Sequence, residues 1–110
     1  MGRLTLTPQV LELIAERFKA LAEPARLRIL ASLRAGELTV GELVDATELS
    51  QANLSKHLRT LHAAGFVARQ RDGQYVRYRL ADPGVFALCD LMCGRLEREH
   101  TRRARVIARE

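Results

Sequence analysis

Apolar residues recur every three or four positions in the first part of the chain, the spacing of a helix with one buried face. The first helix is expected over about residues 8–22, because Thr7-Pro8 combines a capping residue with the residue favoured at the first helical position. Its apolar positions are Val10, Leu11, Ile14, Phe18 and Leu21.

A second helix is predicted to begin at Pro24 and to end before Gly36, since glycine commonly follows a helix C-terminus. Its apolar face consists of Leu27, Ile29, Leu30 and Leu33.

Residues 39–64 show the pattern of a helix-turn-helix. Thr39 and Glu42 form a capping box that starts a short helix ending near Thr47, and Glu48-Leu49 is a tight link. Ser50 caps the next helix, which is expected to end at Gly65 and to bury a stripe of leucines. The stripe is Leu54, Leu58 and Leu61. The opposite, polar side of this helix can present its N-terminal residues to base edges in a major groove.

Residues 66–80 predict a β-hairpin, the wing of a winged helix-turn-helix. Asp72-Gly73 is expected at the centre of a type I′ turn. Along the second strand Val76, Tyr78 and Leu80 alternate with Tyr75, Arg77 and Arg79. This pattern places Arg71, Tyr75 and Arg77 near an exposed tip.

The last helix is expected to open at Asp82-Pro83 and to run over about residues 83–103. Its apolar stripe is Val85, Phe86, Cys89, Met92, Cys93 and Leu96. The tail from Arg95 to Glu110 is rich in charge, and its end is expected to fray. No repeat or linker divides the chain, so residues 1–110 are predicted to form one mainly α-helical domain with a small hairpin.

The positive charge is concentrated in one segment. The chain carries a net charge of +5, and residues 51–79 contain six arginine and lysine side chains against the single carboxylate of Asp72. The rest of the chain is therefore neutral. A basic segment on a neutral scaffold is typical of a nucleic-acid binder, although charge alone also fits a solvated basic surface.

Other function classes find little support in the sequence. There is no apolar run near 18 residues and no signal-peptide core, and two cysteines four residues apart do not form a secreted disulfide framework, so we expect a cytoplasmic protein without a membrane partner. The chain lacks a Gly-rich phosphate loop and an acid/base or nucleophile constellation, so we expect no enzyme. An RNA- or protein-binding winged helix remains an alternative.

Three segments together resemble the ArsR/SmtB family of bacterial repressors. They are Leu21 to Leu30 (LAEPARLRIL), Leu49 to Leu61 (LSQANLSKHLRTL), and Gly65-Phe66-Val67 with the Asp-Gly wing. The resemblance covers about residues 10–100. It implies a homodimer in which the first and last helices form the interface, and repression of an operon that is relieved by an inducer.

The candidate DNA contacts lie on the second helix of the helix-turn-helix and on the wing. We expect Lys56, Arg59, Arg71 and Arg77 to contact phosphates or groove edges. Base-edge or exact backbone contacts are expected from Gln51, Ser55 and His57. Ser50 and Tyr75 are further candidates.

Structural roles are the alternatives at several of these positions. Ser50 fits a helix cap better than a DNA ligand, and His57 could be a hydrogen-bonded packing residue. Tyr75 could only cover the hairpin, and His62 is expected at the surface or as a cap.

Cys89 and Cys93 lie one turn apart on one face of the last helix. Two thiols suit soft ions such as As(III), Sb(III), Hg(II) or Cu(I), with any third ligand from the partner chain or from outside. Zinc would require ligands from both protomers. His100 is a further candidate, but it lies nearly two turns beyond Cys93, roughly 10 Å along one straight helix.

The family's known sensor patterns do not decide the role of the thiols. Thr39 and Gly41 occupy the positions at which one arsenic-sensing pattern of the family has cysteines. Met92, two residues after Asp90, occupies the position at which the zinc-sensing pattern requires a histidine. Members with cysteines in the last helix tend to have a third one, which this chain lacks.

Three interpretations of Cys89 and Cys93 therefore stay open. The first is an inducer site for a soft metal or metalloid, with no cofactor needed for DNA binding itself. The second is a redox switch through a disulfide or polysulfide, since helical Cα atoms four residues apart are about 6 Å from each other. The third is ordinary packing in the core.

Overall fold

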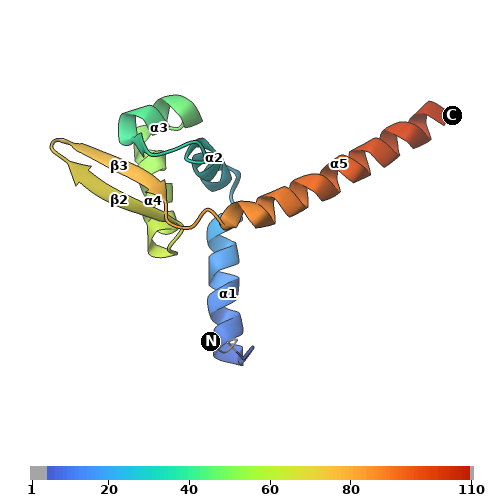
Figure 1. The fold of residues 1–110 in the computed structure, drawn as a ribbon, viewed down its shortest axis with the longest axis horizontal. Helices are drawn as coiled ribbons and strands as arrows, with labels where there is room; N and C mark the ends of the chain where they lie inside the picture. The colour runs from blue at the N-terminus through green and yellow to red at the C-terminus, as the bar shows by residue number, and fades with distance from the viewer. Residues whose placement is uncertain (1–4, 110) are drawn as a thin grey trace.

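The computed structural model describes the backbone of residues 5–109 and the side chains of residues 5–103. Six helices and strands form the winged helix-turn-helix body, and a long helix flanks it at each end (Figure 1). In chain order the elements are α1 (Pro8–Leu21), α2 (Pro24–Ser32), β1 (Leu38–Thr39), α3 (Val40–Thr47), α4 (Gln51–Ala63), β2 (Val67–Asp72), β3 (Tyr75–Leu80) and α5 (Val85–Arg109).

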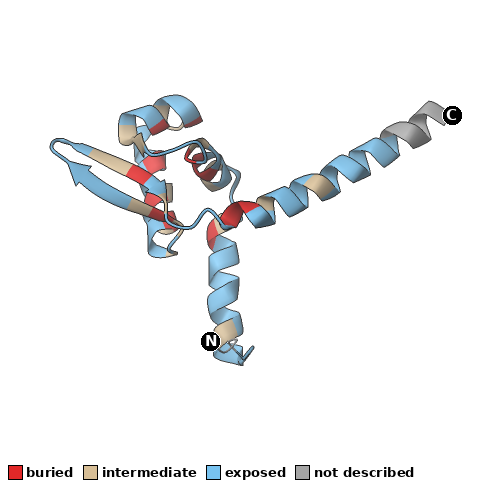
Figure 2. Cartoon of the chain, viewed as in Figure 1, coloured by how far each residue is buried: buried red, intermediate tan, exposed pale blue. Residues whose placement is uncertain are grey.

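The buried residues gather in the body, whereas α1 and α5 project from it in different directions and are exposed over most of their length (Figure 2). Among the described side chains of these two helices, those at the C-terminal end of α1 and in the first turns of α5 pack against the body. None of the described helices is long and apolar enough to cross a membrane.

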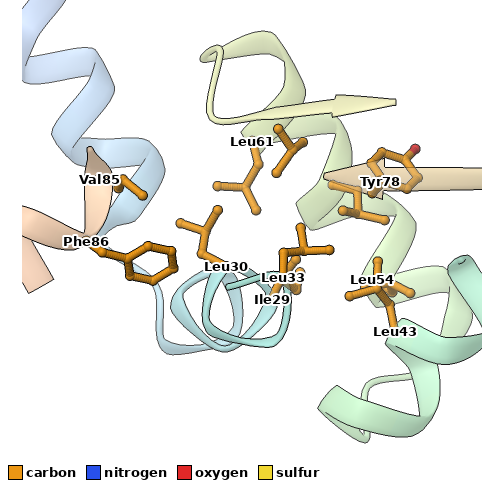
Figure 3. Packing of buried hydrophobic residues seen from close by; sticks show 11 residues of the cluster. Ile29, Leu30, Leu33, Leu43, Leu54, Leu61, Tyr78, Val85 and Phe86 are labelled. Atoms are coloured by element: carbon orange, nitrogen blue, oxygen red, sulfur yellow. The ribbon is translucent and has the colours of Figure 1, made fainter. Parts of the chain in front are cut away.

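The core is built where α2, α3 and α4 meet the sheet (Figure 3). The leucine stripe of α4 is buried as predicted, against Ile29 and Leu30 of α2 and Leu43 of α3. Burying each such side chain contributes about 1.5–3 kcal/mol to stability. Tyr78 from β3 and Phe86 from α5 complete the cluster.

Side-chain caps start the helices where the sequence predicted them. The Thr7 hydroxyl accepts a hydrogen bond from the Val10 N–H at 3.2 Å. Thr39 and Glu42 form the expected capping box, with hydrogen bonds of 2.9 and 3.2 Å. The backbone N–H of Thr39 donates to the Glu42 carboxylate and lowers the pKa of Glu42 below its ordinary value.

The turn between α3 and α4 is held by a buried threonine. The Thr47 hydroxyl donates to the Leu43 carbonyl at 2.6 Å and accepts from the Leu49 N–H at 3.4 Å. Glu48 adopts a left-handed conformation with φ of 60° and ends α3. These bonds set the angle at which α4 leaves α3.

The sheet has three strands in the order β1-β3-β2, one more than the expected hairpin. Strand β1 consists of two residues, too few to show an alternating pattern. The predicted turn centre is wrong by one residue, because Asp72 and Tyr75 pair across the hairpin and leave Gly73-Gln74 as the loop. Gly73 has φ of +62°, as the first central residue of a type II′ turn requires.

Two further expectations need correction. Leu27 was placed on the apolar face of the second helix but is 41% exposed, because the body contacts α2 through Ile29, Leu30 and Leu33. Helix α5 continues to Arg109, beyond the expected end near residue 103. The predicted fraying at the very end of the chain includes Glu110, which lies outside the described residues.

Replacing Thr47 by valine should lower the free energy of unfolding by about 1–2 kcal/mol, because the Leu49 N–H loses its acceptor in a half-buried turn. Thr60→Val is the matched control, since the Thr60 hydroxyl also donates to the carbonyl four residues earlier, that of Lys56, but this hydrogen bond is exposed to solvent. The control should stay within about 0.5 kcal/mol. Urea unfolding at one protein concentration measures both, and equal effects would contradict the role given to the turn.

Candidate nucleic-acid interface

The candidate DNA-binding surface begins on the outward face of α4. Since the leucine stripe faces the core, the polar residues between the leucines lie on the solvent side. The predicted contacts Gln51, Ser55, Lys56 and Arg59 are all exposed there.

Ser50 and His57 already have partners within the protein. The Ser50 hydroxyl accepts from the Asn53 N–H at 3.1 Å and caps α4. His57 is half-buried, and its Nδ1 accepts a hydrogen bond from Nε of Arg26 at 3.2 Å. The structural role that the sequence allowed for each residue is thus present, and a DNA contact from either one stays a prediction.

The two arginines expected at the tip of the wing, Arg71 and Arg77, lie in different surroundings. Arg71 and Tyr75 lie beside the turn and are exposed, and Nε of Arg71 donates to the Gly73 carbonyl at 3.4 Å. Arg77 was expected near the tip, but it lies in the central strand, paired with Thr39 on one side and Gln70 on the other.

An ion pair further restrains Arg77. Its Nε lies 3.4 Å from the Asp72 carboxylate, and its side chain is 36% exposed. Part of its charge is therefore neutralised within the wing, whereas the structure records no carboxylate partner for Arg71 among the described side chains.

Sequence reasoning missed two residues of this surface. Asn53 is exposed in the first turn of α4, where recognition helices contact bases, and an amide can pair bidentately with adenine. Arg69 of β2 lines a cleft of about 510 Å³ between α4 and the wing, together with Ser55 and Arg59. The sequence contained a signal for Asn53: it is an amide side chain in the first turn of the predicted helix, two residues after Gln51.

The two thiols of α5 differ in their surroundings. Cys89 is half-buried and packs against the core, whereas Cys93 is exposed and its Sγ donates to the Glu97 carboxylate at 3.9 Å. His100 is exposed, and within the described part of the chain no three metal-ligating side chains come together. The structure therefore does not bring His100 into a site with the cysteines.

The base of α5 is attached to the turn that follows α2, next to these thiols. Both terminal nitrogens of Arg34 donate to the Asp90 carboxylate, at 3.2 and 3.1 Å, and the guanidinium lies 4.5 Å from the ring centroid of Phe86. The hydrogen bond to Asp90 raises the pKa of Arg34.

Comparison with known proteins identifies the family. Residues 23–69 match the model of the bacterial regulatory protein arsR family. The chain is 45% identical over 74 residues to the transcriptional repressor SmtB of Mycobacterium tuberculosis, and 46% identical over 79 residues to the arsenic resistance regulator ArsR1 of Pseudomonas putida. These matches cover 67% and 71% of the chain, but only 55% and 57% of the relatives.

A solved structure extends the likeness to nearly the whole chain. The homodimeric winged helix-turn-helix DNA-binding domain of Mb0332 from Mycobacterium bovis superposes with a TM-score of 0.77 at 30% identity, covering 90% of this chain and 94% of that domain. The mainly α fold with a wing is thus confirmed. The matching family consists of regulatory proteins, in agreement with the expectation that the chain is not an enzyme. The chain belongs to the ArsR/SmtB family of winged helix-turn-helix transcriptional regulators.

Proposed function

We propose that this protein represses transcription by binding operator DNA as a homodimer. The observation that carries the proposal is the exposed polar face of α4 next to the cationic wing, on a body whose flanking helices leave apolar faces uncovered. The relative SmtB is a transcriptional repressor, and the Mb0332 domain is a homodimeric DNA-binding domain.

The uncovered apolar faces support a second copy of the chain as the partner. Phe18 on α1 is 54% exposed and Leu91 on α5 is 64% exposed. They belong to apolar stripes that also include Leu11, Ile14, Leu88, Met92 and Leu96. Exposed apolar areas of this kind mark interaction sites, and a dimer would hold two recognition helices about 34 Å apart, as successive major grooves require.

Replacing Phe18 by glutamate should convert the dimer to a monomer, because the new charge would be buried in the interface. Since Phe18 is exposed within one chain, the monomer should keep its helical circular dichroism spectrum. Gln9→Glu adds the same charge on the polar side of α1 and serves as the control. Light scattering gives the mass, and a Phe18→Glu variant that stays dimeric would contradict this interface.

The wing contacts can be tested on the DNA duplex that the wild-type chain enriches from a random-sequence library. Arg71→Ala should weaken binding to every sequence and reduce the slope of log K against log salt by about 2, because each protomer loses one phosphate contact. Arg77→Ala should reduce the slope less, since Asp72 already neutralises part of this charge. A larger change in slope for Arg77→Ala than for Arg71→Ala would make Arg77 the main phosphate contact of the wing and contradict this prediction.

We further propose that a thiophilic ion at Cys89 and Cys93 releases the repressor. Two thiols one turn apart, one of them exposed, fit a two-coordinate soft ion, and a third ligand would come from the partner or from solution. ArsR1 is an arsenic resistance regulator. Ligation at Cys89 would act beside the contact of Phe86 and Asp90 with Arg34, which sets the position of α5 on the body.

The double variant Cys89→Ser, Cys93→Ser should bind the enriched duplex with wild-type affinity but lose the release by As(III) or Hg(II). Release of the wild type should correspond to at least about a five-fold change in affinity, the lower end of ordinary coupling between two sites. The chain has two cysteines, so no other thiol can substitute. Fluorescence anisotropy measures the release. Release by peroxide alone would favour the redox interpretation, and release that survives in the double variant would assign the thiols to packing.

A further inference from the structure

Arg26, at the third position of α2, contacts both α1 and α4. In the proposed function α1 belongs to the dimer interface and α4 binds DNA. Its Nε donates to Nδ1 of His57 in the middle of α4 at 3.2 Å. Its Nη1 donates to the carbonyls of Lys19 and Ala20 in the last turn of α1, each at 3.2 Å. One guanidinium therefore satisfies the free carbonyl end of α1 and holds an imidazole of the recognition helix.

The hydrogen bond from Arg26 determines which nitrogen of His57 carries the proton. A guanidinium only donates, so Nδ1 must be the acceptor and the proton of the neutral ring must lie on Nε2. The Nε2–H is then available as a donor, and no partner for it is recorded among the side chains and backbone groups that the structure describes. Phosphate oxygens and guanine O6 or N7 accept hydrogen bonds.

The surroundings of Arg26 favour a phosphate as the acceptor. Arg26 lines a cleft of about 670 Å³ between α1 and α4. Arg17, Lys19 and Arg59 also line it, with Glu16 as its one carboxylate. His57 does not itself line this cleft, but its hydrogen bond to Arg26 places it next to the cleft. An excess of cationic side chains near a donor attracts the DNA backbone more than a neutral base edge.

We propose that Arg26 is a positioning residue for DNA recognition: it fixes His57 as the Nε2–H tautomer that donates to a phosphate, and it ties α4 to the end of α1. The inference rests on the proposed function, because it needs operator DNA as the ligand and α1 as part of the dimer. Arg26 itself contributes through His57 and does not have to touch the DNA.

The first test is a nitrogen NMR spectrum of the His57 ring in the full chain without DNA. The wild type at pH 7.5 should show the Nε2–H tautomer, and Arg26→Gln should show a mixture of both tautomers. An Nδ1–H tautomer or a doubly protonated ring in the wild type would overturn the inference, whether or not the protein binds DNA.

The second test compares two replacements of His57 on the enriched duplex. His57→Gln keeps an N–H near the position of Nε2 but offers Arg26 no acceptor near Nδ1, and it should lose less affinity than His57→Asn. His57→Asn keeps an acceptor near Nδ1 for Arg26 but has no donor at Nε2, and it should lose about ten-fold or more, the value of a hydrogen bond to a charged group. The reverse order of affinities would contradict donation from Nε2.

A double-mutant cycle separates positioning from a merely structural role. Arg26→Gln should weaken operator binding about ten-fold in the wild type and little further in His57→Asn. Arg28→Gln is the matched control from the same helix, because Arg28 donates to the Thr47 carbonyl at 3.1 Å and does not contact His57. Its effect should add to that of His57→Asn and should leave the tautomer unchanged.

The outcomes distinguish this inference from the proposed function. A wild-type chain that enriches no duplex overturns the proposed function and, with it, the DNA step. Wild-type binding with additive effects of Arg26→Gln and His57→Asn overturns the inference alone. If Arg26→Gln does not fold, the two His57 variants together with the NMR spectrum of the wild type still decide.

Discussion

The contact between the leucine stripe of α4 and helix α2 is the interaction on which the rest of the structure depends. Leu54, Leu58 and Leu61 bury one side of α4 against Ile29 and Leu30. Because a helix has only one side free after such packing, the same contact decides which residues face the solvent. The candidate DNA-binding surface is thus a direct result of core packing.

Helix α2 and the residues just after it serve as the connector of the molecule. Arg26 reaches α1 and α4, Arg28 reaches the end of α3, and Arg34 reaches α5. Each arginine binds a carbonyl, an imidazole or a carboxylate that fixes a neighbouring element. The position of α4 relative to the two proposed dimer helices therefore depends on polar contacts, whereas its burial depends on leucines.

Local patterns in the sequence predicted much of the fold. The caps at Thr7, Thr39 and Ser50 and the leucine stripe of α4 are local signals, and the structure confirms them. Local patterns failed to predict the structure where strand pairing determines it. β1 is a strand only because it pairs with β3. The hairpin loop lies one residue later than the Asp-Gly pair indicated.

The candidate site could be predicted less completely than the fold, because its details depend on long-range contacts. Helical periodicity placed Lys56 and Arg59 on the exposed face of α4. It could not show that Arg77 would pair with Asp72, or that Arg26 would meet a histidine 31 positions away. An alternating strand pattern gives the face of a side chain and says nothing of its partner.

The attachment of α5 makes this helix a lever. Arg34, Phe86 and Asp90 fix its first turns to the body, and the 25 residues of the helix span about 37 Å in all. Tilting the root by about 5° would displace the far end by about 3 Å, given that length. A small displacement near the root would thereby be enlarged at the far end of α5, the helix that we propose forms part of the dimer interface.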